Sequence, residues 1–284
     1  MSSRTLDDAL ADLDRIFAVT RASRSRLGLF PAMYRQVTRS IHRAVREGGL
    51  FDDDERLERV ATIFADRYIS AFDGHHAGGA VARCWHTTFE VAEGRRRRMI
   101  LQHLLMGMNA HINFDLGIAA ADVTGEEIRL LHDDFVRVNE ILFVMVDRLQ
   151  GSLGDVSPRM ALLDRLGRDW DEALMRFGIR EARAMAWPFA LRVAASDEPA
   201  RRVVIEDRDS DAELVGRLIT GGWSPVHVVG RLIASAEFDD VPAIMDTLAA
   251  LEVDPFVAAD APLVTLEADD IRLGSRVSRR MRRG

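Results

Sequence analysis

The sequence predicts an all-α protein, a multi-helix bundle arranged around one buried central helix at about residues 99–121. Three observations support this fold class. Aromatic residues make up only 7% of the 284 residues, whereas Leu, Ala, Val and Met are frequent, a composition that favours helices over sheets. Apolar residues recur at helical spacing along most of the chain. The stretch Met99–Ala121 carries no charge before Asp115 and is apolar around its whole circumference, as expected for a helix buried on every side.

Four helices and one loop are expected before the central helix. Apolar residues at helical spacing indicate a helix at residues 5–20 and a second at 31–47, which starts with a proline and is followed by two glycines. Acidic residues open a third helix at 52–72, and a short fourth helix contains Trp85. Between these last two, Asp73–Ala80 has three glycines and a His pair in eight residues, which predicts a loop.

The helix after the central one is expected to begin at Thr124, a good N-cap followed by two glutamates, and to run to about Gln150. The short segment Val203–Ile205 is compatible with a strand or with a helix. The remaining expected helices are Pro158–Leu166, Trp170–Ala194, Asp211–Thr220, one opening at Ser224-Pro225, and Phe238–Leu251.

The best candidate for a domain boundary is Ser196–Pro199. We therefore expect a helical core domain at 1–195 and a C-terminal helical extension at 196–270, packed on or appended to the core. The final segment, 271–284, is rich in Arg and poor in apolar residues, which predicts a disordered tail.

Composition excludes several classes of function. The net charge of −7 argues against a nucleic-acid-binding protein, which needs a basic face. A single cysteine, Cys84, excludes an internal disulfide and a Cys-rich zinc module. We find neither a leader sequence nor an apolar run long enough to span a membrane, so we expect a cytoplasmic location. The signature strings of the common phosphate-binding, hydrolase and zinc-protease classes are also missing.

Polar residues form two stripes within the apolar central helix. Gln102, Asn109 and Asn113 lie along one side, and His111 and Asp115, one turn apart, lie on roughly the opposite side. Because a buried polar group costs free energy unless it has a partner, these side chains must belong to a polar network, a metal site or a ligand pocket.

The strongest catalytic candidates are His111, Asp115 and His132. The first two project from one face of the central helix, and His132 comes from the next helix, which a short connection makes a neighbour. Together they supply the nitrogen and oxygen ligands that zinc or non-haem iron needs, so they are also the candidate metal ligands. The candidate ligand-binding residues around them are His76, His103, Asn109, Asn113 and Asn139.

The string at Gln102–Gly117, QHLLMGMNAHINFDLG, resembles the signature of an uncharacterised all-helical bacterial family, a domain-of-unknown-function group. The segment Tyr68–Gly79 is similar to that family as well, although His75 stands where the family pattern leads us to expect an aromatic residue. The resemblance covers about the first two-thirds of the chain and implies that these segments form one domain. It implies no activity. Further short matches are Asp134-Phe135-x-x-Val138-Asn139, Ser157-Pro158 and Ala186-Trp187.

Two functions from different classes remain open. The first is an enzyme acting on a small, partly apolar molecule, with His111 as general base or metal ligand, Asp115 as its partner and His132 as the opposing acid; a bound metal would favour hydrolysis. The second is a non-catalytic helical binding or scaffold protein, in which the same residues form a structural polar network. Convergence of the residues on a cavity that solvent can reach would favour the enzyme. The sequence leaves a homo-oligomer open.

Overall fold

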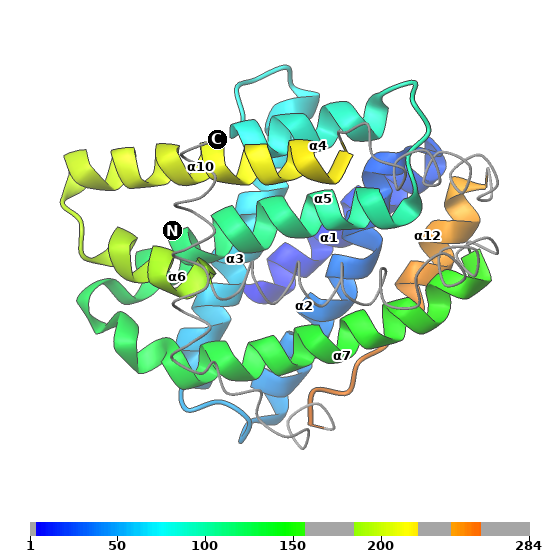
Figure 1. Ribbon diagram of the computed structural model, residues 1–284. Helices are drawn as coiled ribbons and strands as arrows, with labels where there is room; N and C mark the ends of the chain where they lie inside the picture. The colour runs from blue at the N-terminus through cyan, green and yellow to red at the C-terminus, as the bar shows by residue number, and fades with distance from the viewer. Residues whose placement is uncertain (1–3, 157–184, 221–239, 257–284) are drawn as a thin grey trace, which may run out of the picture.

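The computed structural model describes residues 4–156, 185–220 and 240–256 (Figure 1). Over these residues every regular element is a helix and none is a strand, which confirms the predicted all-α fold class. No helix in the described ranges is both long and apolar enough to cross a membrane. The expected helix at Pro158–Leu166, the one opening at Ser224-Pro225 and the tail at 271–284 lie outside the described residues.

Three N-terminal helices pack against one another: α1 (Leu6–Ala22), α2 (Leu29–Glu47) and α3 (Asp54–His76). The Thr5 hydroxyl accepts a hydrogen bond from a backbone N–H in the first turn of α1, and the Asp53 carboxylate does the same for α3. The apolar faces of the three helices merge into one core. Helices α2 and α3 form the wall on which the central helix packs.

The prediction of a loop at Asp73–Ala80 is wrong over its first half, because α3 continues through the His pair. The His75 Nε2 atom lies 3.0 Å from a carboxylate oxygen of Glu93, and the ring of His76 hydrogen bonds to a backbone carbonyl one turn earlier. These partners stabilise the last helical turn. The chain reverses only at Gly78, whose positive φ of 69° suits glycine.

The central helix consists of α5 (Ile100–Ala110), a π-helical turn at His111–Asp115 and α6 (Leu116–Thr124), in direct succession. Every residue from Met99 to Ala121 is buried. In the π turn, the N–H of Leu116 donates to the carbonyl of His111, five residues earlier. Figure 1 shows α5 in the middle of the bundle; it contacts α2, α4 and α10, whereas α6 packs on α3.

Helix α4 (Arg83–Glu93) and helix α10 (Glu198–Thr220) lie side by side over the central helix. The carboxylate of Asp209 in α10 accepts hydrogen bonds from the backbone N–H groups of Arg83 and Cys84, at 2.8 and 2.9 Å. A residue distant in sequence therefore supplies the N-cap that the segment before α4 lacks.

The first polar stripe of the central helix docks α10. Side-chain amides of Gln102 and Asn109 donate to backbone carbonyls of α10, at 2.9 and 2.7 Å. In return, Arg208 of α10 donates to the backbone carbonyl of Asn113 at 2.6 Å. The segment Val203–Ile205, compatible with strand or helix from the sequence, is helical and belongs to α10.

The expectation that Thr124 opens the next helix is wrong. Thr124 is the last residue of α6, and its hydroxyl donates to the carbonyl of Ala120. Gly125, with a positive φ of 50°, turns the chain into a 3₁₀ segment at Gly125–Leu131. Helix α7 then begins at His132 and extends to Val156. The two glutamates that suggested a helix start lie in the 3₁₀ segment.

A short helix, α12 (Val241–Ala249), packs on α2 and contacts α7. The Ser40 hydroxyl donates to the carbonyl of Val253 at 2.7 Å, and the Gln36 amide donates to that of Ala249. These bonds connect the described C-terminal segment directly to α2.

Gly107 permits close contact between α5 and α2, because a Cβ atom there would overlap the ring of Phe30. Gly107→Ala is expected to lower the free energy of unfolding by about 1–3 kcal/mol, since a methyl group inserted into a packed core forces its neighbours to move. Urea unfolding measures this loss. Gly74→Ala is the control, because its added Cβ would come close to a single side-chain atom, Val81 Cγ1, at 3.2 Å, and would overlap no ring. Equal losses in the two variants would contradict this account.

Candidate functional site

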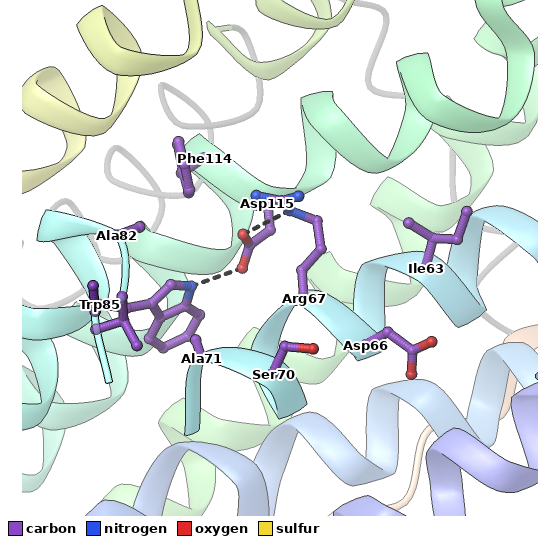
Figure 2. Close-up of a pocket in the computed structure, with 11 residues that line it drawn as sticks. Ile63, Asp66, Arg67, Ser70, Ala71, Ala82, Trp85, Phe114 and Asp115 are labelled. Carbon is purple, nitrogen blue, oxygen red and sulfur yellow. Dashed lines mark hydrogen bonds and ion pairs between the residues drawn. The ribbon is translucent and has the colours of Figure 1, made fainter. Parts of the chain in front are cut away.

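A pocket of about 390 Å³ opens between α3, the segment before α4, and the π-helical turn (Figure 2). Arg67, Trp85 and Asp115 form its polar end, and Figure 2 shows Arg67 and Trp85 both reaching Asp115. Asp66 and Ser70 line it farther along α3. The rest of the lining is apolar and consists of Ile63, Ala71, Ala80, Val81, Ala82 and Phe114.

Asp115 is the centre of the polar end. Its side chain is 1% exposed, yet it accepts three hydrogen bonds: from Arg67 Nε at 3.0 Å, from Trp85 Nε1 at 2.8 Å and from His111 Nδ1 at 3.1 Å. A buried carboxylate is tolerable only when such donors replace water. Three helices therefore meet at one carboxylate, which fixes the orientation of each donor.

Arg67 carries the positive charge of the pocket. Its Nε bonds Asp115 and its guanidinium lies 5.4 Å from the centre of the Phe114 ring. The side chain is 27% exposed. Among the described residues, neither Nη atom has a hydrogen-bond or ion-pair partner, so this edge of the guanidinium is available to a ligand.

His111 lies behind Asp115, inside the core. Its ring stacks on Phe64 at 3.6 Å and meets the edge of Tyr34 at 4.3 Å. Burial lowers the pKa of His111, so the ring is neutral near pH 7, and because the carboxylate can only accept, Nδ1 carries the proton. The Nε2 atom has no hydrogen-bond partner in the described part of the chain. The His111 ring borders a separate apolar cavity of about 30 Å³.

The π turn coincides with the residues of the predicted pair, His111 and Asp115. Such turns insert one residue into an α-helix and are frequent at functional sites. The predicted contact between the two side chains is confirmed. Sequence reasoning missed the π turn, because one inserted residue does not disturb the polarity of a stretch that is apolar on every side.

The structure does not bring His132 to this pair. His132 begins α7 with its side chain 47% exposed; Nδ1 lies 3.0 Å from Asp133, and the ring packs on Trp187. The intervening 3₁₀ segment moves the start of α7 away from the position that a direct connection predicted. His132 therefore lies on the surface and does not reach His111 or Asp115.

The other predicted ligand-binding residues have separate environments. Asn113 donates to Asn109 at 2.9 Å, and both hold α10. His76 lies at the end of α3, stacked on a phenylalanine. His103 is buried and lines a small cavity. Asn139 lies in α7, and its side chain is outside the described part.

The zinc or iron site expected from the sequence has no ligand set in the ranges described. No group of three or more His, Cys, Asp or Glu side chains there is arranged to hold a metal ion. The physical reason is that both oxygen atoms of Asp115 already accept hydrogen bonds from N–H donors, three in all. His132, the third expected ligand, pairs instead with Asp133 at the start of α7.

Sequence reasoning also missed Arg67 and Trp85. Both lie on helices that carry core residues, and an arginine or an indole N–H that is turned toward a core needs a buried acceptor. That signal predicts a partner without identifying it, because Asp115 is 48 residues from Arg67 and 30 from Trp85.

Comparison with known protein families gives a match over most of the chain. The profile of a family of unknown function, DUF5995, covers residues 6–221, from the start of α1 to the end of α10. No curated protein and no solved structure matches the chain. The matched region includes Arg67, Trp85, His111 and Asp115, so the whole site lies within it. It also confirms the resemblance to a helical family of unknown function, and the chain belongs to the family DUF5995.

Proposed function

We propose that the pocket binds a small organic carboxylate with an apolar body, and that the free edge of Arg67 pairs with its carboxylate. The observation that carries this proposal is a guanidinium held through Nε by a buried Asp115, with both Nη atoms left to the pocket. A guanidinium edge matches the two oxygens of a carboxylate, and such charge-assisted pairs are among the stronger hydrogen bonds.

The walls of the pocket define the rest of the ligand. Apart from Asp66 and Ser70, the residues beyond the polar end are aliphatic side chains and Phe114. A volume of about 390 Å³ falls within the usual range for small-molecule sites. Asp66 does not offer a free charge, because Arg4 hydrogen bonds to it. The pocket thus suits one anionic group attached to an apolar chain or ring.

His111 acts in this proposal as a positioning residue. Its Nδ1–H and the Trp85 N–H hold Asp115, which in turn holds Arg67. The imidazole ring borders the inner cavity and does not line the carboxylate pocket. The proposal keeps the small, partly apolar ligand that the sequence suggested. It drops proton transfer by His111, because the His111 ring does not line the pocket.

Calorimetry with benzoate and octanoate tests the proposal, with benzamide and 1-octanol as neutral analogues and inorganic phosphate as an anion without an apolar body. We expect the carboxylates to bind and the neutral analogues to bind about tenfold more weakly or not at all. Arg67→Gln should weaken carboxylate binding by a similar factor. Ala82→Phe should block the pocket and leave the Asp115 hydrogen bonds in place.

Arg59→Gln is the matched control, because Arg59 is an exposed arginine on the same helix that pairs with Glu55. It should bind like the wild type. Failure of both carboxylates to bind, or equal binding to the Arg67→Gln variant, would contradict the proposal and favour the structural network that the sequence left open. Binding of phosphate alone would replace the carboxylate with another class of anion.

A further inference from the structure

Two buried polar atoms without partners belong to side chains that border one small cavity. Tyr68 in α3 and His103 in α5 are 1% and 5% exposed. Neither the Tyr68 hydroxyl nor His103 Nε2 has a hydrogen-bond partner within the described residues. Both side chains line a cavity of about 20 Å³, together with Arg26, Trp85 and Thr88. This cavity is separate from the carboxylate pocket, although Trp85 borders both.

Leaving both atoms without a hydrogen bond would be costly, because each loses its contact with water on folding and gains nothing in return. Two such atoms on different helices, from side chains that border the same cavity, point to one ligand that they share. The indole N–H of Trp85 is not available to them, since it donates to Asp115.

The cavity limits that ligand in size. A volume of about 20 Å³ admits a molecule of the size of water and is far below the roughly 300 Å³ or more of a usual small-molecule site. It also limits the chemistry. A tyrosine hydroxyl donates and accepts, and a neutral imidazole nitrogen does one or the other, so the ligand must be able to do both.

Thr88 offers a third partner. Its hydroxyl donates to the carbonyl of Cys84 at 2.7 Å, which leaves an oxygen lone pair free to accept. Buried water molecules in proteins make about three hydrogen bonds. Tyr68, His103 and Thr88 supply that number.

We propose that one water molecule binds in this cavity and bridges the Tyr68 hydroxyl and His103 Nε2. This water site assigns a role to His103, which sequence reasoning identified as a ligand-binding residue. It joins α3 to α5 next to the wall of the carboxylate pocket, and it does not depend on whether that pocket binds a carboxylate.

A crystal structure of the full chain at high resolution tests the proposal directly. We expect one ordered water within about 2.6–3.2 Å of both atoms. A direct Tyr68–His103 hydrogen bond, or a cavity without solvent density, would overturn it.

A double-mutant cycle gives a second readout. Tyr68→Phe and His103→Leu each remove one partner of the water, so their effects on the unfolding equilibrium constant should be coupled several-fold, with the double variant losing less than the product of the two single losses. Tyr34→Phe combined with His103→Leu is the control, because Tyr34 does not line this cavity. If the Tyr68→Phe and His103→Leu variants changed the unfolding equilibrium constant independently of each other, the proposed water bridge would be wrong.

Discussion

Replacement of Asp115 by alanine is expected to lower the free energy of unfolding by about 3–5 kcal/mol, more than the overlap introduced by Gly107→Ala. The substitution removes the acceptor for three N–H donors, on Arg67, Trp85 and His111. Trp85 and His111 are 1% and 2% exposed, so their N–H groups lose their acceptor inside the core. Urea unfolding followed by circular dichroism measures the loss.

Asp115→Asn separates the charge of Asp115 from its shape. The amide retains one acceptor oxygen but presents an NH₂ group where a second donor pointed, so we expect an intermediate loss. Asp73→Ala is the control for removing an ion pair alone, since Asp73 is 49% exposed and bonds Arg15. It should cost less than about 1 kcal/mol. An Asp115→Ala loss as small as that of the control would show that the three hydrogen bonds contribute little.

The fold class and the central helix could be predicted from the sequence because burial on every side leaves a direct mark on composition. Met99–Ala121 has almost no charge, and all of its residues are buried. The contact between His111 and Asp115 could also be predicted, because four residues along a helix is a short and nearly fixed distance.

The donors that complete the site could not be predicted, since Arg67 and Trp85 reach Asp115 from other helices. The prediction that His132 lies beside His111 and Asp115 is wrong for a related reason. A seven-residue 3₁₀ segment changes the direction of the chain before α7, and the glutamates in it resemble a helix start. Local spacing predicts contacts within a helix, whereas contacts between helices depend on connections that local patterns describe poorly.

The second large effect concerns pH. Burial, with smaller contributions from Arg26 and Arg98, lowers the pKa of His103 from its ordinary 6.5 to about 3. Between these values the unfolded chain binds a proton at His103 and the folded protein does not. The stability is therefore complete above about pH 6.5 and falls as the pH drops. The loss due to His103 is about 2 kcal/mol at pH 5 relative to pH 7, and it approaches about 5 kcal/mol below pH 3.

His103→Leu isolates this contribution, because leucine does not titrate. The wild-type free energy of unfolding minus that of the variant should fall by about 2 kcal/mol between pH 7 and pH 5. His111 has its pKa lowered in the same direction, and burial raises the pKa of Asp66, but both are present in the two proteins and cancel in the difference. His86→Leu, at an exposed histidine, should leave the wild-type profile unchanged. Parallel profiles for wild type and His103→Leu would contradict the lowered pKa of His103 in the folded protein.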